Sequence, residues 1–384
     1  MDYLLTEEQI MIRDLARQIA EEKIRPVAAQ YDESEEFPWP VVKALAESDL
    51  CGIYIPEEYG GTGGGVTELA IATEELSKAC GGIALAFAAT ALGTYPILLY
   101  GNEEQKKKYV PDIAKGKKLA AFAITEAEAG SDVGNMRTSA KKDGDYYILN
   151  GTKQWITNGG EAETYTVIAI TDKSKGARGA SAFILEKGMP GFDFGKKEKK
   201  MGIRGSTTRE LVFTDCKVPK ENLLGREGMG FIIAMKTFDN SRPGVAAQAL
   251  GIAQGAFDLT LKYAHERHQF DRPISSFQGI QFMLADMAAQ IEAARALIIS
   301  AARMVDSGAK NVSRVSAMTK MFASDMAMKV TTDCVQIYGG YGYMRDYPIE
   351  KYMRDAKITQ IYEGTNQILR GVIASNLIKG MMKK

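Results

Sequence analysis

The hydrophobic period of this 384-residue chain changes twice, and this change constrains the fold more than any other feature. Over residues 6–118, apolar residues recur at the spacing of an amphipathic helix, after a capping box that begins at Thr6. Over residues 120–228, turn signals such as Asn150-Gly151 separate short runs rich in β-branched and aromatic residues. The helical period then returns and continues to the end. The pattern predicts a helical part, a β part and a second helical part, in that order.

The expected fold is α+β with three domains. An N-terminal α-helical domain is expected over residues 1–119, a middle antiparallel β-sheet or barrel domain over 120–230, and a C-terminal four-helix bundle over 231–384. Closely spaced turns favour antiparallel strands, and four long helical segments with short links favour a bundle. Pro243 and Gly244 should kink or interrupt the first bundle helix.

Charge and composition argue against several classes of function. The chain has 48 Lys and Arg against 48 Asp and Glu, so no net charge draws it to nucleic acid or to an anionic membrane. Four cysteines without a CxxC pair and only two histidines predict neither a metal site nor a disulfide framework. Glycines and Pro96 within the uncharged stretch 79–101 argue against a membrane span. The acidic start does not resemble a signal peptide, so we expect a cytoplasmic protein.

Several motifs, in a fixed order, carry the functional information. They read Ile124-Thr125-Glu126-Ala127-Glu128-Ala129-Gly130-Ser131-Asp132, Gln336-Ile337-Tyr338-Gly339-Gly340-Tyr341-Gly342, Tyr352-Met353-Arg354-Asp355-Ala356-Lys357 and Ile361-Tyr362-Glu363-Gly364-Thr365-Asn366-Gln367. Together they resemble the acyl-CoA dehydrogenase family, and the resemblance covers essentially the whole chain. It implies an enzyme that removes two hydrogens across the Cα–Cβ bond of an acyl-CoA thioester. It also implies FAD as the cofactor, held without a Rossmann unit.

Glu363 is the candidate catalytic base. Desaturation of a thioester needs a base for the α-proton and an acceptor for the β-hydride, and no side chain accepts hydride, so the flavin N5 must. A carboxylate beside an apolar acyl chain and an uncharged flavin is desolvated, which raises its pKa toward a useful range. By itself Glu363 could equally be a glutamate at a helix start, but it matches the catalytic motif of the family. Some branches place the base at the position of Ser241, where a serine cannot serve.

The resemblance assigns FAD contacts in two groups. The isoalloxazine ring is expected to meet Phe122, Ile124, Thr125, Trp155 and Thr157. The pyrophosphate and adenosine are expected to meet residues of a neighbouring subunit, namely Arg267, Phe270, Gln278, Gln336, Gly339 and Gly340, and also Thr365 and Gln367. Without the resemblance, Trp155 could be a core residue and Arg267 a surface charge. A site built by two subunits implies a homo-oligomer, in this family commonly a homotetramer arranged as a dimer of dimers.

The acyl-CoA substrate is expected to meet Ser131, Phe238, Asp239, Arg242 and Gly364. Ser131 could instead be a turn residue, and Arg242 could pair with Asp239. In the family, the helix near residues 77–93 lines the end of the acyl pocket. Here it is rich in Gly and Ala, which fits either close helix packing or room for a medium-length, branched or ring-bearing acyl group, such as a cyclic or aryl one. From Cys80 onward this helix carries no Arg or Lys, so it lacks the cation that a carboxylate-tailed substrate would need. Residues 239–243 resemble the medium-chain branch and much of the β domain resembles the short-chain branch, so the chain length stays open.

An electron-transferring flavoprotein is the partner that the resemblance implies. One alternative is an acyl-CoA oxidase or another flavin enzyme on the same fold, which the reaction of the reduced flavin with oxygen would distinguish. The second alternative is a non-catalytic flavin-binding member. Such a member would have a basic surface if it bound nucleic acid, and the zero net charge does not support one.

Overall fold

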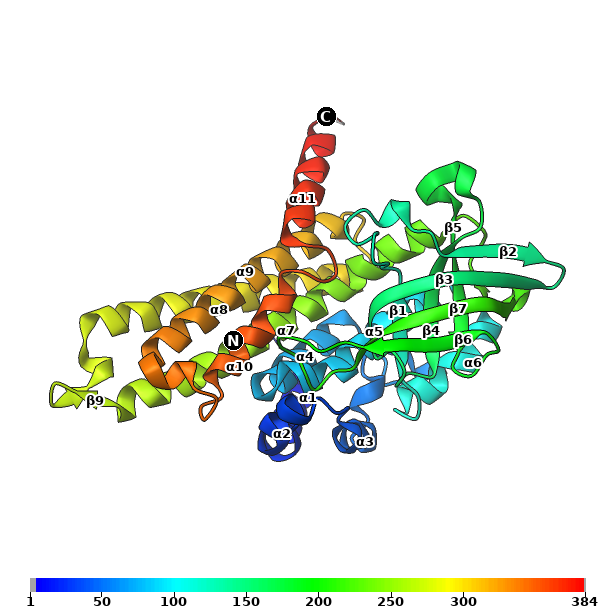
Figure 1. Ribbon diagram of the computed structural model, residues 1–384. Coiled ribbons are helices and arrows are strands. Elements are labelled where there is room, and N and C mark those ends of the chain that lie inside the picture. The colour runs from blue at the N-terminus through cyan, green and yellow to red at the C-terminus, as the bar shows by residue number, and fades with distance from the viewer. Residues whose placement is uncertain (1–4, 383–384) are drawn as a thin grey trace.

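The computed structural model describes residues 5–382 and has the helical, β and helical parts in the expected order (Figure 1). The first four residues, on which part of the signal-peptide argument rests, lie outside the described range. The β-sheet lies at one side of the molecule and long helices extend to the other, with α4 (Val66–Ala79) and α5 (Gly81–Tyr100) between them. The boundaries of the three domains stay a prediction.

The N-terminal helices begin where the sequence indicates. The remaining helices of this part are α1 (Glu7–Ile19), α2 (Ala28–Ser34), α3 (Trp39–Glu47) and α6 (Glu103–Ala114). The predicted capping box is confirmed, because the Gln9 amide donates to Thr6 Oγ1 at 3.2 Å and the Thr6 amide donates to Gln9 Oε1 at 3.1 Å. Helix α4 is capped differently, by the carboxylate of Asp306, which accepts from the Val66 and Thr67 amides at 2.7 and 2.9 Å. A distant acidic residue therefore stabilises the start of α4.

Helix α5 is continuous, and the glycines and Pro96 lie within it. Among the described residues, it is the one helix long and apolar enough to cross a membrane, but 78% of its apolar window is buried inside the protein. Its small residues allow close packing, since a Cβ at Gly81 would lie 2.5 Å from Ile252 and one at Gly93 would lie 2.5 Å from the Ala121 amide. At these glycines, the close-packing interpretation of the sequence is the correct one.

The middle part is a mixed sheet with strand order β6-β7-β3-β2-β4-β5-β8 and with β1 beside β4. Its strands are β1 (Ala120–Ala123), β2 (Ser139–Asp143), β3 (Tyr146–Thr157), β4 (Thr164–Ile170), β5 (Ala180–Glu186), β6 (Phe192–Lys197), β7 (Thr208–Pro219) and β8 (Leu223–Leu224). Most neighbours are antiparallel, as expected. However, β4 pairs in parallel with both β1 and β2, which corrects a purely antiparallel sheet. A tight turn allows only antiparallel pairing, whereas a long connection also allows parallel pairing. Long connections join these strands, which explains why they can be parallel.

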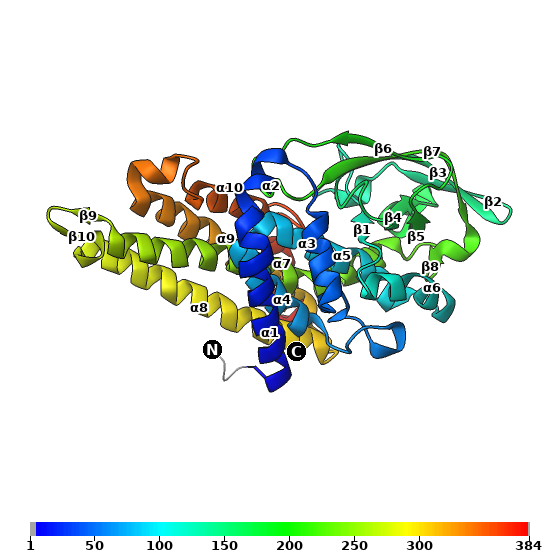
Figure 2. The ribbon, with the colours of Figure 1, turned by 90° about the horizontal axis from the view of Figure 1, so that it is seen from below.

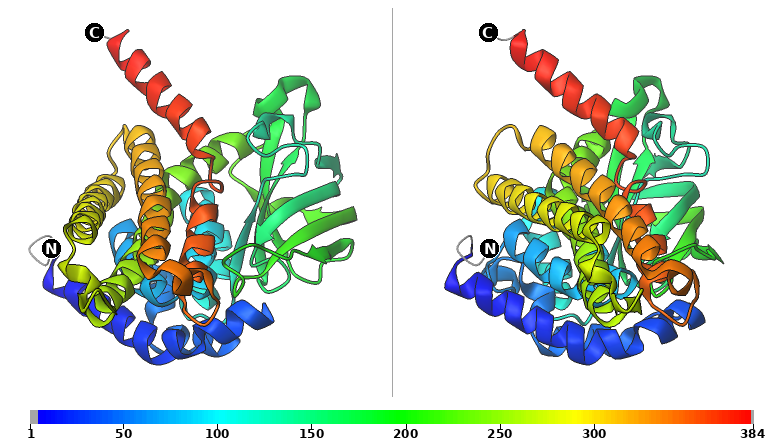
Figure 3. Two further views of the ribbon diagram at one scale, coloured as in Figure 1. Left: turned by 60° about the vertical axis from the view of Figure 1, so that its left-hand side comes forward. Right: turned by 90° about the vertical axis from the view of Figure 1, so that its left-hand side faces the viewer.

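The C-terminal part contains α7 (Gly230–Glu266), α8 (Gln278–Asp306), α9 (Val312–Tyr338), α10 (Ile349–Thr359) and α11 (Asn366–Met381). Helix α7 runs through Pro243, so the predicted restart of the helix is wrong, while the alternative kink stays a prediction. Proline cannot donate to the carbonyl of Asp239, and the Ser316 hydroxyl donates to that carbonyl at 2.7 Å instead. Helix α11 does not lie along the bundle as its fourth member but projects from the body (Figure 3). Helix α4 packs against α7 and α8 instead.

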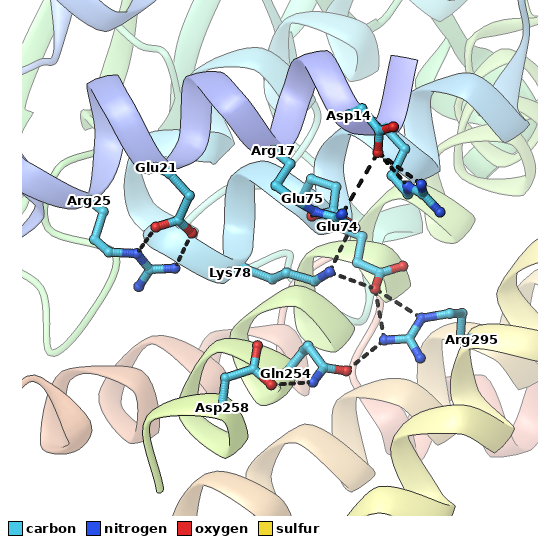
Figure 4. A network of polar contacts seen from close by, with 11 residues as sticks. Asp14, Arg17, Glu21, Arg25, Glu74, Glu75, Lys78, Gln254, Asp258 and Arg295 are labelled. Carbon is cyan, nitrogen blue, oxygen red and sulfur yellow. Dashed lines mark hydrogen bonds and ion pairs between the residues drawn. The ribbon is translucent and has the colours of Figure 1, made fainter. Parts of the chain in front are cut away.

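A polar network joins α1 to the bundle across α4 (Figure 4). Glu75 accepts from Arg17 at 3.1 Å and from Lys78 at 2.7 Å, while the neighbouring Glu74 pairs with Arg295 of α8 at 2.9 Å. Figure 2 shows α1 and α4 lying across α7 and α8 at this junction. The N-terminal helices are thus tied to the C-terminal ones by charge as well as by apolar contact.

Candidate active site

A cavity of about 330 Å³ lies where α5, α7, the edge of the sheet and the turn between α10 and α11 meet. Segments far apart in the sequence build its walls. The sequence-predicted residues that line it are Phe122, Ile124, Thr125, Ser131, Trp155, Thr157, Phe238, Arg242, Glu363 and Gly364. The structure therefore brings together the predicted base, the first group of flavin residues and most of the predicted substrate residues.

Glu363 stands on the cavity wall in a constrained turn. Its φ is 52° and that of Gly364 is 94°, so two consecutive residues adopt the left-handed conformation. For a residue with a side chain this conformation costs about 1 kcal/mol or more, so the surroundings must hold it. The Ser241 hydroxyl donates to Glu363 Oε2 at 2.6 Å, and Arg242 Nε donates to the Glu363 carbonyl at 3.3 Å. Two adjacent residues of α7 thereby fix the side chain and the backbone of the candidate base.

The electrostatic surroundings of Glu363 suit a proton acceptor. Burial raises the pKa of its carboxyl group above the ordinary value. The Ser241 hydrogen bond and the charges of Arg242 and Lys320 lower it, but the net direction is upward. A carboxylate with a raised pKa is a stronger base than one in water, while hydrogen bonding to the ionised form keeps it available.

Arg242 is itself buried, with its guanidinium 5.6 Å from the centre of the Phe238 ring. Asp239 lies 3.8 Å from this guanidinium and does not line the cavity, in contrast to its predicted contact with the substrate. Burial raises the pKa of Asp239. The pairing that the sequence left open as an alternative is the one found, because the two residues are one helical turn apart on the buried face of α7.

The cavity wall formed by the end of β3 carries an exposed aromatic residue, and the strand is distorted at this point. Trp155 has a φ of 57° and leaves 54% of its surface exposed, although it belongs to a central strand. A register shift between Lys153 and Ile156 causes this orientation. Behind the wall, Asn158 Nδ2 donates to the Ala86 carbonyl at 3.3 Å and to Thr90 Oγ1 at 3.2 Å. These bonds fix β3 against α5, and the sequence did not predict them.

The part of the cavity between α4, α5 and α7 is mainly apolar. Its walls there include Leu69, Leu85, Ala88, Ala89, Leu92 and Val245. Gln248 is an exception: it accepts a hydrogen bond from the Tyr362 hydroxyl, and its Nε2 donates to the Gly81 carbonyl at 2.9 Å. The polar groups of Gln248 are therefore satisfied within the wall and do not need a polar substrate.

The second group of predicted flavin residues lies elsewhere. Arg267, Gly339 and Gly340 line a different hollow at the far end of the bundle, where the guanidinium lies 5.4 Å from the centre of the Tyr341 ring. Phe270 is 87% exposed nearby, while Gln278 and Gln336 are exposed on α8 and α9. Thr365 and Gln367 line a third hollow beside Asp325 and Arg370. None of these eight residues lines the main cavity.

Sequence analysis missed two polar residues beside Glu363. Ser241 was considered only as a position for a base and not as a hydrogen-bond donor. Lys320 was not singled out, although Ser316, Lys320 and Ser324 recur every four residues on a face of α9 that is otherwise rich in alanine. A lysine in register with buried residues is a signal that could have identified it.

Comparison with known families accounts for nearly the whole chain. Residues 6–117 match the acyl-CoA dehydrogenase N-terminal domain, 121–216 the middle domain and 228–378 the C-terminal domain. A short-chain-specific acyl-CoA dehydrogenase of Clostridium acetobutylicum is 49% identical over 99% of this chain and 100% of its own length.

Two solved structures are also similar. Butyryl-CoA dehydrogenase from Megasphaera elsdenii has a TM-score of 0.96 and 48% identity, covering 98% of this chain and all of its own. A chain from a structure described as the electron transferring flavoprotein of Acidaminococcus fermentans has a TM-score of 0.96 and 55% identity, covering 98% and 99%. Full-length matches at this identity establish the relationship, and the chain belongs to the acyl-CoA dehydrogenase family.

Proposed function

We propose that this protein dehydrogenates short-chain acyl-CoA thioesters, with Glu363 as the base that removes the α-proton. The observation that carries the proposal is the partly buried carboxylate of Glu363 on the wall of an apolar cavity, with its pKa raised by burial. Dehydrogenation of acyl-CoA is the activity of the family. The relatives named as short-chain specific and as butyryl-CoA dehydrogenase support the choice of chain length.

The cavity residues suit the FAD on which this family depends. A large aromatic side chain that stays exposed beside hydroxyl groups offers a flat apolar surface and hydrogen-bond donors, as an isoalloxazine ring needs. Trp155 is this aromatic residue, and Thr157, Thr125 and Phe122 of β1 line the same cavity. When bound, FAD supplies the hydride acceptor that no side chain can provide.

The residues of the chain would divide the remaining work. Arg242 and Ser241 hold Glu363 in place, so that the carboxylate meets the α-carbon without reorganisation. The apolar wall excludes water and thereby keeps the carboxylate basic. Ser131 and Phe238 on the cavity rim are proposed to meet the CoA part, together with Gly364. Asp239 acts through Arg242.

A short acyl group agrees with the hydrogen-bonded groups beside the apolar part of the cavity. The Gln248–Tyr362 hydrogen bond and the Gly81 carbonyl occupy the wall between α5 and α7, and a longer chain would have to displace these satisfied groups. The nearby wall offers no cation from α5 for a carboxylate-tailed substrate.

We further propose that a homotetramer completes the cofactor site and that an electron-transferring flavoprotein receives the electrons. The hollow with Arg267, Gly339 and Gly340 lies at the far end of the bundle and is the proposed binding place for the adenosine end of a neighbour's FAD. Phe270 beside it is a large apolar side chain that is almost fully exposed in one chain. Contact with a neighbouring subunit or its cofactor would cover this side chain. The solved relative described as an electron transferring flavoprotein supports the partner.

Anaerobic titration of the purified holoenzyme tests the proposal. Butyryl-CoA is expected to bleach the flavin fastest in a panel with octanoyl, isovaleryl, glutaryl, cyclohexanecarboxyl and phenylpropionyl thioesters. Glu363→Gln should lower the bleaching rate by about 10³-fold or more, while the exposed control Glu104→Gln should leave it unchanged. Faster bleaching by a longer or cyclic thioester would refute the short-chain assignment, and bleaching that survives in Glu363→Gln would refute the base. Rapid reoxidation by air would indicate an oxidase.

A further inference from the structure

Lys320 is a fully buried lysine without a carboxylate partner. Its exposed fraction is 0%, and its ammonium donates to the Gly364 carbonyl at 2.8 Å and to Asn366 Oδ1 at 3.1 Å. Within residues 5–382 no Asp or Glu oxygen lies within the 4.0 Å of an ion pair with it. A buried charge without an ionic partner is costly, so its presence needs a reason other than stability.

The bond from Lys320 falls on the turn that carries Glu363. Glu363 and Gly364 both have a positive φ, and their two carbonyls are bound by two buried cations from different helices. Arg242 of α7 binds the carbonyl of Glu363, and Lys320 of α9 binds that of Gly364. Two successive carbonyls held from two helices leave the turn little freedom to rotate.

The second partner of Lys320 is itself rigidly placed. Asn366 is buried, and its Nδ2 donates to Ser324 Oγ at 2.9 Å and to Asp325 Oδ1 at 2.7 Å. Its backbone amide donates to the Gln360 carbonyl at 3.1 Å. The amide oxygen of Asn366 therefore has a fixed direction, and it determines where the ammonium of Lys320 can lie.

We propose that Lys320 is a positioning residue for the base: it locks the Glu363–Gly364 turn in its left-handed conformation and keeps a positive charge near the Glu363 carboxylate. The inference rests on the proposed role of Glu363. Lys320 is absent from the cavity lining, so it acts through the turn and through its field.

The charged groups around Lys320 define the expected electrostatic effect. They are Glu363 in the turn, Arg242 and Asp239 of α7, Asp325 on the same helix and Arg370 of α11, which pairs with Asp325 at 2.8 Å. Burial lowers the pKa of Lys320 to about 7, and the charge of Lys320 in turn lowers the pKa of Glu363. Removal of this charge should therefore raise the pKa of Glu363 further.

The test uses the FAD-loaded enzyme with Lys320→Met, which keeps the side-chain length but removes the donors and the charge. We expect kcat to fall by about 10- to 100-fold with a much smaller change in substrate affinity. In the pH profile of kcat/KM, the acidic limb should move to higher pH by about one unit. Hydrogen exchange of residues 362–366 should become faster, a readout that does not depend on catalysis.

Two further variants separate the bond from the charge. Lys320→Gln offers a neutral donor, so it should restore part of the exchange protection while the acidic limb stays displaced; it also carries the test if Lys320→Met does not fold. Lys329→Met removes an exposed lysine of the same helix, which pairs with Asp333 and has no part in this network, and both readouts should stay close to wild type. Folded Lys320 variants with wild-type exchange and an unmoved limb would overturn the inference. Survival of activity in Glu363→Gln would instead refute the proposed base and leave the exchange result standing.

Discussion

Two lysines near the cavity, neither of them part of its lining, have an exposed fraction of 0%, and they are partnered in opposite ways. Lys153 of β3 pairs with Glu126 at 2.8 Å and donates to the Ile124 carbonyl at 2.9 Å. Lys320 of α9 reaches only uncharged oxygens. Burial lowers the pKa of Lys153 to about 8 and that of Lys320 to about 7. A buried lysine that pairs with a carboxylate is an anchor, because the pair holds two segments together. A buried lysine without such a partner has a charge that changes the pKa of neighbouring groups.

The largest expected effect comes from breaking the paired lysine. Glu126→Gln leaves the Lys153 ammonium buried without its counter-charge, and we expect a loss of about 3–5 kcal/mol in the free energy of unfolding. Urea denaturation measures this loss. Adding Lys153→Met to Glu126→Gln should recover most of it, because the uncompensated charge is then removed. A single variant within 1 kcal/mol of wild type would contradict the anchor role.

The pH dependence of stability should separate the two lysines next. Both have a folded pKa below the ordinary lysine value of 10.5, so the unfolded chain binds more protons between the two values and stability rises with pH there. The rise should begin near pH 7 for Lys320 and near pH 8 for Lys153, at up to about 1.4 kcal/mol per pH unit. Unfolding at a series of pH values, with each lysine replaced by Met, measures each contribution as a lost slope. Identical slopes in the two variants would mean that a carboxylate partner does not change how a buried lysine affects the pH dependence of stability.

A carboxylate that binds backbone amides offers a third case with a smaller effect. Asp306 accepts from the Val66 and Thr67 amides and from the Thr67 hydroxyl. Asp306→Ala should destabilise the protein by about 1–2 kcal/mol, and Asp306→Asn by less, since the amide retains one acceptor oxygen. Denaturation midpoints compare the two variants. Equal losses would show that packing matters at this position and capping does not.

The smallest expected effect concerns the hydrogen bond to the base. Ser241→Ala removes the donor to Glu363 Oε2, so the pKa of Glu363 should rise. We expect the acidic limb of kcat/KM to move upward by about half a pH unit, which corresponds to roughly 0.7 kcal/mol. Ser241→Thr, which keeps the hydroxyl, serves as the control. A limb that moves downward would show that the serine does not stabilise the charged form.

The features that could be predicted from sequence are local ones. The capping box at Thr6 and the two changes of period depend on residues within a few positions of each other, and the structure confirms them. Part of the cavity wall could be located because the motifs at 124–132 and 361–367 contribute residues to it. The parallel pairing of β4 with β1 could not be predicted, since it joins strands across a long connection.

Long-range partners explain the other differences. A proline favours a break in a helix because the carbonyl four residues earlier loses its donor. In α7 this carbonyl belongs to Asp239, and the Ser316 hydroxyl of α9 donates to it instead, so the helix continues. The bond from Lys320 to Gly364 and the bond from Ser241 to Glu363 likewise join separate elements. The glycines of α5 left close packing and pocket space open as alternatives, because the groups that pack against them, such as Ile252, are distant in sequence.

The close fit between α5 and α7 has a consequence for biosynthesis. Helix α5 ends at Tyr100, but the helix that covers one of its faces begins only at Gly230, so the ribosome must translate the whole sheet before that face is shielded. During this interval the nascent chain presents an apolar helix of a length and composition that chaperones and membranes bind. Fragments that stop before α7 would keep the same face uncovered. We therefore expect this face to stay uncovered on the nascent chain until α7 has been made.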